Sequence, residues 1–568
     1  MSSKFKVECI DCGHQAPFTV STVSCPKCGG DWRETKYDYE KLKETFLNQI
    51  KHRPFDLWRY RELLPVRTPN PELTLGEGGT PMIRAANLGM MLGCPHIYMK
   101  DERQGPTTSF KDRQAAVTIA ALKEAGITEA VIASTGNVAI SYSAYAARAG
   151  IKLWAFITSL VPPVKMREAA LYGTQVIKVT GNYDQAKQVA AEFARERALY
   201  VDRGVRSITT VDSMKTISYE IAEQLTTILG PPNSGNGSFK PDTPWRAPDW
   251  YLQSVSGGMG PIGVLKGFNE LQEMGLINSV PALGNFQAAG CAPMVTAWKA
   301  GKDVAEPVRT PRTHIATLAT GDPGRTYTLL RERMLANKGG AFESVTDEEA
   351  FKAMRILAQM EGVSVEPATA VAFAGLIKLV RENIIKPTDV VVINCTGHTI
   401  PVAQEIIGEG WARDVEYPSE GIESMIPAED GLLAALNRVT ADRYTRIAIV
   451  DDHPHVRLLI RRILQSQGNY TLFEAEDGKS AISLIKKELP DLIILDLMMP
   501  EMDGFSVIDA LRSDPTTASI PVIVVTAKEL TNKEKKRLEG QIQSLMQKGD
   551  FMSDELMAEV QLLIEDKK

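Results

Sequence analysis

The sequence predicts an α/β protein built from more than one domain, and two observations carry this prediction. The chain has 568 residues, whereas one domain usually holds roughly 100–200. Between Tyr37 and about Trp411, apolar runs of strand length alternate with amphipathic helical runs, as in residues 130–133 followed by residues 138–148. This alternation is typical of helices that cover both faces of a largely parallel sheet.

Composition narrows the class of protein. Hydrophobic residues make up 44% of the chain and charged residues 24%, and the net charge is −6. These values are ordinary for a soluble globular protein and give no basic excess for nucleic acid. No stretch approaches the ~18 apolar residues of a membrane span, and no apolar signal region follows Met1. We therefore expect a cytoplasmic protein with no nucleic-acid or membrane partner.

The first element of the chain is a pair of cysteine knuckles. Two Cys-x-x-Cys motifs, with twelve residues between them, contribute Cys9, Cys12, Cys25 and Cys28. This spacing predicts a four-thiolate tetrahedral zinc site. Because structural zinc sites fill all four positions, we expect a folding staple for a segment too short to have its own core, and no catalysis. A redox pair or an iron–sulfur ligand set is the alternative.

The next feature is a lysine that follows a predicted strand. Residues 97–100 have the pattern of a strand, and a helical pattern starts at Ser109. Lys111 therefore falls in the first turn of this helix. Near the positive end of a helix dipole the pKa of its amine should fall, which makes it a better nucleophile and suits a Schiff base. A solvated surface lysine is the alternative.

Three further loops follow predicted strands, where ligands bind in α/β sheets. The glycines of residues 256–260 can let backbone N–H groups and a helix N-terminus surround a phosphate, or form only a turn. Residues 134–137 offer hydroxyl, amide and backbone donors to a carboxylate or a phenolic oxygen, although an N-cap also explains them. Thr396 supplies a hydroxyl where a ring nitrogen can lie, or a capping group.

These loops belong to a set of motifs that resembles threonine synthase. The motifs keep the family's order, and the resemblance covers about residues 1–412, including the cysteine knuckles. They stand at residues 57–60, 75–81, 106–113, 133–137, 366–370 and 396–398. The resemblance implies a two-lobed fold like that of the tryptophan synthase β subunit. It also implies a lyase or synthase reaction in which O-phosphohomoserine gives threonine and phosphate.

The same resemblance implies that pyridoxal 5′-phosphate is bound covalently to Lys111. Asn137 would contact the phenolic oxygen of the cofactor ring, and Thr396 would face the ring nitrogen. The freed lysine would move protons at the substrate's α and β carbons. A neutral hydroxyl at Thr396 would favour elimination and replacement over transamination. The other implied contacts are Gly257, Gly258, Met259 and Gly260 for the phosphate, and Ser134 and Thr135 for the carboxylate of an amino-acid substrate.

Two departures from the family pattern leave the substrate open. Val138 stands where these enzymes usually have Thr or Ser, and residues 207–212, before a helix expected near Ser213, lack the usual Asn-rich stretch. In the family these positions help to hold the substrate phosphate. A hydroxyl lost there removes a bond worth roughly 1.5–3 kcal/mol. Elimination or replacement at the β carbon of phosphoserine, serine or threonine therefore fits these residues nearly as well as the reaction of O-phosphohomoserine.

A second parallel α/β unit is predicted near the C-terminus, and acids stand at its strand ends. Its first strand is followed by Asp451 and Asp452, and a later strand by Asp496. Three carboxylates at neighbouring strand ends repel one another unless a cation lies among them, and oxygen ligands select Mg²⁺. A third strand ends in Thr526, and Lys548 lies further along the chain. Solvated loop acids are the alternative.

The motifs around these residues resemble a response-regulator receiver over residues 444–568. This resemblance implies a flavodoxin-like (βα)5 fold. It also implies that Asp496 is phosphorylated by a histidine kinase or a phosphotransfer protein, and that Thr526 and Lys548 contact the phosphoryl oxygens. The implied magnesium ligands are Asp451, Asp452, Asp496 and the carbonyl of Met498.

These patterns together predict four segments. They are a zinc ribbon at 1–36, a pyridoxal-phosphate-dependent catalytic domain at 37–413, an acidic linker at 414–443 and a receiver at 444–568. Because no further output domain is predicted after the receiver, we expect that the lyase is the output and that phosphorylation regulates its activity. We also expect a homodimer. The alternative is a signalling scaffold whose enzyme-like part binds an amino acid or metabolite without turning it over.

Overall fold

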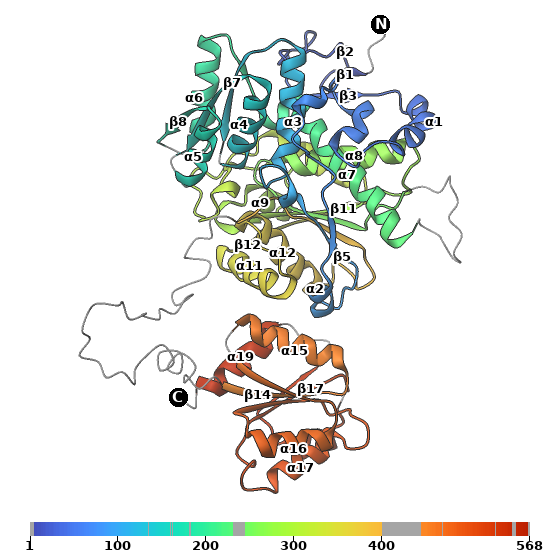
Figure 1. Ribbon diagram of the computed structural model, residues 1–568, viewed down its shortest axis with the longest axis vertical. Helices are drawn as coiled ribbons and strands as arrows, with labels where there is room; N and C mark the ends of the chain where they lie inside the picture. Colours follow the sequence, from blue (N-terminus) through green and yellow to red (C-terminus); the bar gives the residue numbers. More distant parts are fainter. Residues whose placement is uncertain are drawn as a thin grey trace, which may run out of the picture. The chain divides into compact units, whose positions relative to one another are not determined.

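The computed structural model shows an α/β protein, which confirms the predicted class (Figure 1). The described residues form two compact units. The larger unit holds a small N-terminal sheet and two α/β lobes, and the smaller holds a five-stranded sheet. Thr135, Lys548 and the predicted linker at 414–443 lie outside the described residues. The described residues are 5–134, 136–158, 161, 163–180, 183–230, 245–399, 445–467, 470–528, 530–547 and 553–565.

The N-terminal sheet has three antiparallel strands in the order β2-β1-β3. So small a sheet buries little apolar surface by itself. Phe5, Val7 and Trp32 therefore join the hydrophobic core of the larger unit. The buried hydroxyl of Thr35 donates a hydrogen bond of 2.5 Å to Asp212 elsewhere in the larger unit. The bounds are β1 Lys6–Cys9, β2 Gln15–Ala16 and β3 Arg33–Lys36, followed by α1 Tyr39–Ile50.

One lobe of the larger unit is built on a six-stranded sheet with the order β12-β11-β10-β13-β5-β4. All neighbouring strands are parallel except β4, which pairs with β5 in the antiparallel direction. The strands are β4 Met82–Arg84, β5 Ile97–Lys100, β10 Trp250–Ser254, β11 Ala282–Ala288, β12 Gly340–Val345 and β13 Val391–Asn394. The helices of this lobe are α7 Ile208–Leu229, α8 Met259–Glu273, α9 Pro293–Lys299, α10 Arg325–Leu335 and α12 Pro367–Arg381. Helix α11 Asp347–Glu361 begins in the larger unit, whereas its residues from Arg355 on and α2 Ala86–Met91 belong to the smaller unit.

The other lobe has a four-stranded parallel sheet with the order β8-β7-β6-β9. Its strand residues alternate between two cores. Ala130 and Ile132 pack with residues of α3 and α4, whereas Val131 packs with residues of α6 on the opposite face. Figure 1 shows α4, α6 and β7 in teal and α3 in light blue. The bounds are β6 Glu129–Ser134, β7 Lys152–Thr158, β8 Gln175–Val179, β9 Tyr200–Val201, α3 Lys111–Glu124, α4 Asn137–Ala149, α5 Pro163–Leu171 and α6 Tyr183–Glu196.

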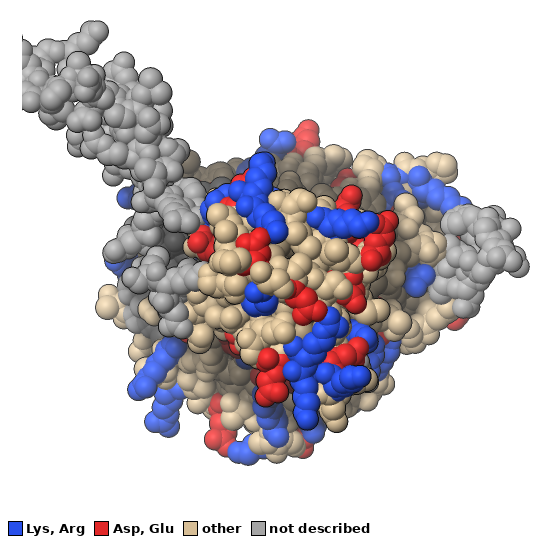
Figure 2. Space-filling view, turned by 90° about the horizontal axis from the view of Figure 1, so that it is seen from below, with Lys and Arg blue, Asp and Glu red and all other residues tan. Residues whose placement is uncertain are grey.

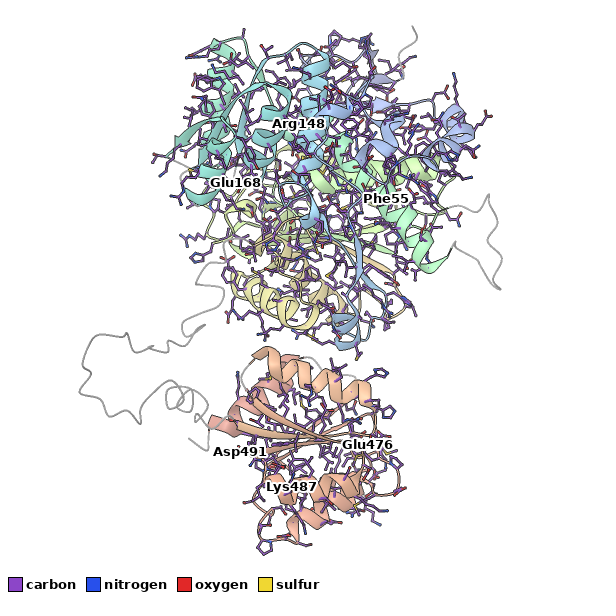
Figure 3. All side chains as sticks on the ribbon, viewed as in Figure 1. Phe55, Arg148, Glu168, Glu476, Lys487 and Asp491 are labelled. Carbon is purple, nitrogen blue, oxygen red and sulfur yellow. The ribbon has the colours of Figure 1, made fainter. Side chains whose placement is uncertain are left out.

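The smaller unit contains a five-stranded parallel sheet with the order β15-β14-β16-β17-β18. Alternate residues of β14 again face two cores, one with α15 and α19 and one with α16 and α17. Asp491, labelled in Figure 3, accepts a 2.9 Å hydrogen bond from the backbone N–H of Arg446 and so joins the starts of β16 and β14. The bounds are β14 Thr445–Val450, α15 Pro454–Gln467, β15 Tyr470–Ala475, α16 Gly478–Glu488, β16 Leu492–Leu495, α17 Gly504–Arg512, β17 Val522–Thr526, α18 Asn532–Leu538, β18 Ser544–Gln547 and α19 Ser553–Glu565.

The structure corrects one predicted helix start. The sequence predicts a helix from about Ser213, but α7 begins at Ile208. The first turns of α7 contain polar residues whose side chains can compete with the backbone for hydrogen bonds, and such residues are typical of loops. In the folded chain these side chains bond to other elements instead. Thr209 accepts from Thr118 at 3.0 Å, and Asp212 accepts from Lys266 at 2.6 Å.

Charge is mixed on the visible surface. Figure 2 shows Lys and Arg interspersed with Asp and Glu on the face that it displays. This pattern agrees with the absence of a basic excess in the sequence. Among the described helices, none combines the length and apolar character that crossing a membrane requires.

Candidate active-site cavity and receiver site

A cavity of about 540 Å³ in the larger unit gathers most of the residues predicted to bind the cofactor. Lys111 and Asn137 reach it as the first residues of α3 and α4, and Thr396 reaches it from the loop after β13. Strand ends and helix N-termini thus meet here, as they do at ligand sites of parallel sheets. The four predicted phosphate contacts also line the cavity and are Gly257, Gly258, Met259 and Gly260.

Lys111 has the environment that a reactive amine requires. Its Nζ lies 4.2 Å from the centroid of the Phe110 ring. Burial lowers the pKa of the Lys111 amine to about 8, and the charges of Glu366 and Asp202 partly oppose this effect. The direction is the one expected from the sequence, and burial is its main cause. An amine with this pKa has a usable neutral fraction near neutral pH, as a base or nucleophile needs.

Glu366 is a central residue of the cavity, although no individual role was predicted for it within the motif at 366–370. Its side chain is 5% exposed and lines the cavity. It accepts 2.8 Å hydrogen bonds from Asn137 Nδ2 and from Thr396 Oγ1. One carboxylate therefore joins two predicted cofactor contacts and places a negative charge near Lys111. Its partner Asn137 lies 229 positions away in the sequence, so no local pattern could have revealed this role.

The other contacts of Asn137 and Thr396 tie them to further elements. Lys165 Nζ donates a 2.8 Å hydrogen bond to Asn137 Oδ1. The Thr396 hydroxyl lies 2.7 Å from the hydroxyl of Thr369, near the start of α12. These bonds fix both side chains in the cavity wall. Contact of Asn137 with a phenolic oxygen, and of Thr396 with a ring nitrogen, stays a prediction.

The glycine loop after β10 leaves room that other residues would fill. Gly258 has a φ of +82°, and a Cβ there would lie 2.7 Å from Thr326 Cγ2. A Cβ on Gly260 would lie 2.3 Å from Gln253 Nε2. The loop opens α8, whose first residues line the cavity, and the free N–H groups at a helix N-terminus can bind an anion. Together with the amine of Lys111, this cradle fits pyridoxal phosphate, which needs a phosphate site and a lysine.

Ser134, unlike the predicted cofactor contacts, is not among the residues that line the cavity. It is 1% exposed, and its Oγ accepts hydrogen bonds from the backbone N–H groups of Gly136 at 3.0 Å and Ala139 at 2.9 Å. This is a capping arrangement at the start of α4, the alternative that the sequence left open. The predicted role of Ser134 at the substrate carboxylate stays untested, and Thr135 lies outside the described residues.

The four predicted zinc ligands come together in the N-terminal sheet. The sulfurs of Cys9, Cys12, Cys25 and Cys28 all lie within 4.8 Å of one another. Cys9 and Cys28 are 3.6 Å apart, and Cys12 and Cys25 are 3.8 Å apart. Four sulfurs at a Zn–S distance of about 2.3 Å in a tetrahedron are roughly 3.8 Å apart. The arrangement therefore fits tetrahedral zinc, which we propose as its ligand.

The predicted receiver residues stand at neighbouring strand ends. Val450 and Leu495 are paired in parallel, so Asp451 and Asp496, the residues after them, leave the sheet at the same edge. Asp496 is 2% exposed, and it accepts a 3.1 Å hydrogen bond from the backbone N–H of Met498. This placement suits a shared cation site.

Two further observations refine this receiver site. Asp451, Asp452 and His453 each offer a ligand atom, and these atoms lie within 4.8 Å of one another. His453 stands in the loop before α15, and its Nδ1 lies 2.6 Å from Asp452 Oδ1. Thr526 ends β17 and is fully buried. Lys548 lies outside the described residues, and the roles of these residues in Mg²⁺ and phosphoryl binding stay predictions.

Comparisons with known proteins cover both units. Residues 73–397 match the family of pyridoxal-phosphate dependent enzymes, and residues 447–561 match the response regulator receiver domain. A threonine synthase from Methanocaldococcus jannaschii is 35% identical over 393 residues, which are 69% of this chain and 91% of that protein. A threonine synthase from Methanosarcina acetivorans is 31% identical over 405 residues, 71% of this chain and 94% of that protein.

Proposed function

The chain belongs to the pyridoxal-phosphate dependent enzymes and carries a receiver domain, and we propose that it converts O-phosphohomoserine and water to threonine and phosphate. The observation that carries this proposal is the position of Lys111, a buried amine of lowered pKa in a cavity with a phosphate cradle. The similarity to two threonine synthases over nine-tenths of their length supports it.

The proposed chemistry divides between the cofactor and the protein. Pyridoxal phosphate, when bound, supplies the electron sink for negative charge at the substrate's α carbon. Lys111 then moves protons at the α and β carbons, because its amine can both lose and accept a proton near neutral pH. Glu366 keeps the ammonium form of Lys111 accessible by offsetting part of the cost of burial. It also holds the Thr396 hydroxyl in the wall.

A panel of amino acids tests this proposal on the purified holoenzyme. We expect O-phosphohomoserine to release phosphate and threonine in equal amounts. Phosphoserine, serine and threonine serve as competing substrates, with release of a keto acid as the readout of β-elimination. Absence of phosphate release from O-phosphohomoserine, together with turnover of another member of the panel, would overturn the assignment of substrate.

A second candidate reaction is elimination or replacement at the β carbon of phosphoserine, serine or threonine. The observation that favours it is Val138, an apolar residue that lines the cavity where the family usually offers a hydroxyl to the substrate phosphate. Replacing Val138 by Thr separates the two reactions. If O-phosphohomoserine is the natural substrate of the wild-type enzyme, this change should have little effect on its KM. A large fall in that KM would favour the second candidate.

We propose further that the receiver regulates the enzyme when a histidine kinase or phosphotransfer protein phosphorylates Asp496 with Mg²⁺ bound. The matched receiver family and the common sheet edge of Asp451 and Asp496 support this proposal. The test compares the rate of amino-acid turnover with and without an acyl phosphate. A rate that is the same in both conditions would overturn the regulatory role. Cofactor binding without any turnover would favour a metabolite-sensing scaffold instead.

A further inference from the structure

Two acids of the N-terminal zinc ribbon reach arginines that line the active-site cavity. Asp31, just after the second cysteine knuckle, lines the cavity itself. Its Oδ2 accepts 2.8 Å hydrogen bonds from both Arg203 and Arg206. Asp11, inside the first knuckle, pairs with Arg325. All three arginines line the cavity. The segment expected to be only a folding staple therefore contributes to the wall of the proposed active site.

The arginines at Asp31 stand on a segment with little regular structure of its own. Arg203 precedes and Arg206 ends a single 3-10 turn, Gly204–Arg206, between β9 and α7. Arg203 also donates a 2.8 Å hydrogen bond to the carbonyl of Val23, which lies between the two knuckles. The side chain of Arg206 is 44% exposed, so packing alone does not fix its guanidinium. The ribbon thus supplies the acceptors that hold both groups.

The charges of this cluster favour an anionic ligand. Burial raises the pKa of Asp31, but the hydrogen bonds and charges of Arg206 and Arg203 outweigh it and keep the pKa below its ordinary value. One carboxylate against two guanidinium groups leaves a net positive charge. Each guanidinium carries five N–H donors, so bonds to the ribbon leave further donors for a ligand. Planar guanidinium groups match the oxygen geometry of a phosphoryl group.

We propose that Asp31 is a positioning residue that holds Arg203 and Arg206 so that they bind the phosphoryl group of the substrate. The zinc ribbon is then a part of the substrate site as well as a folding element. This inference rests on the proposed function, because it takes a phosphorylated amino acid as the substrate. The competing explanation is that the Asp31 ion pairs only fasten the ribbon to the rest of the enzyme.

A matched control separates these explanations. Glu34, on β3 of the same ribbon, pairs with Arg333 at 3.0 Å. Arg333 stands on α10 and is not among the residues that line the cavity. Glu34→Gln therefore weakens a ribbon-to-body ion pair without touching the cavity. Asp31→Ala removes the acceptor of both cavity arginines, and Asp31→Asn keeps its size and one oxygen for the case that the alanine variant folds poorly.

The experiment uses the zinc-loaded holoenzyme and two readouts. Calorimetry measures the Kd of inorganic phosphate, and steady-state kinetics measure KM and kcat for the phosphorylated amino acid. We expect Asp31→Ala to raise both Kd and KM about tenfold, as for loss of positioned charge-assisted hydrogen bonds, with kcat largely kept. Asp31→Asn should give a smaller change in the same direction. Glu34→Gln should leave all three quantities at the wild-type values.

Several results would overturn the proposal. One is an equal effect of Asp31→Ala and Glu34→Gln, which would show a fastening role. Another is tighter phosphate binding in either Asp31 variant, which would show that the carboxylate only neutralises the arginines. Absence of phosphate binding by the wild-type holoenzyme would also overturn it. If no phosphorylated amino acid turns over, but Asp31→Ala still weakens phosphate binding tenfold, then the proposed function fails and the role of Asp31 stands.

Discussion

The cavity of the larger unit and the acidic edge of the receiver are built on the same architectural principle but differ in their charged groups, since the cavity wall holds both bases and acids. Each lies where parallel strands end at their carboxyl side. The cavity presents the amine of Lys111, three arginines and a glycine cradle. The receiver edge presents Asp451, Asp452 and Asp496. The position of each site therefore follows from the order and direction of the strands, and its chemistry follows from the side chains at the strand ends.

The two sites also differ in how their charge is balanced. In the cavity, Glu366 acts on Lys111, and the ribbon acids pair with the arginines. Such a site can hold its charges before a ligand arrives. Carboxylates gathered at one edge repel one another, and a bound cation relieves this repulsion. In one site the protein's own side chains neutralise one another's charge. In the other, we expect an added cation to neutralise the carboxylates.

The largest effect is expected from Lys111→Ala. Loss of the amine should lower kcat/KM by about 10³-fold or more, because proton transfer by a positioned side chain supplies up to about 10⁴-fold. The visible absorbance of the bound cofactor should change as well. Phosphorylation of the receiver should stay at the wild-type level. Lys123→Ala, near the other end of α3, is the control and should keep full activity. Activity retained in Lys111→Ala would contradict the assigned base.

The reciprocal change is Asp496→Asn in the receiver. We expect phosphoryl incorporation from an acyl phosphate to fall at least ~100-fold, since the acceptor carboxylate is gone. Cofactor absorbance and basal turnover should remain unchanged. The control is Asp491→Asn, which alters an acid at the opposite end of the same strand, β16. Equal labelling of the wild type and Asp496→Asn would place the phosphoacceptor elsewhere.

A smaller effect is expected from Asp452→Asn, which tests the dependence of the receiver on an added ion. Removing one of the clustered carboxylates should raise the Mg²⁺ concentration for half-maximal phosphorylation about tenfold, because ligand charge sets affinity for hard cations. The measurement is the initial rate of labelling over a magnesium titration. Glu488→Gln is the control, since Glu488 ends α16 and pairs with Arg446. An unchanged titration curve would remove Asp452 from the proposed site.

The smallest effect is expected on the pKa of Lys111, which the nearby carboxylates of the cavity raise. In cofactor-free protein, labelling of the Lys111 amine should rise through a midpoint near pH 8, the value to which its pKa is lowered. The Glu366 carboxylate favours the ammonium form, so Glu366→Gln should move this midpoint to lower pH by roughly one unit. Asp202→Asn should produce a smaller shift, because Asp202 contributes less to the pKa. A shift to higher pH would contradict this account.

Much of the site was visible in the sequence because it rests on local patterns. The spacing of Cys9, Cys12, Cys25 and Cys28 predicted a group of thiols, and the structure brings their sulfurs together. Lys111 was placed in the first turn of a helix, and it is the first residue of α3. Such features depend on backbone conformation within a few residues, which sequence patterns record directly.

The tertiary structure alone decided the partners of these residues. The bonds of Glu366 to Asn137 span 229 positions, and those of Asp31 to Arg203 and Arg206 span 172 and 175. The start of α7 at Ile208 likewise depended on hydrogen bonds from distant side chains. The sequence by itself thus determined the α/β class and predicted which side chains carry the chemistry. Packing of distant elements determined how charge is balanced, because pairs so far apart in the chain meet only after folding.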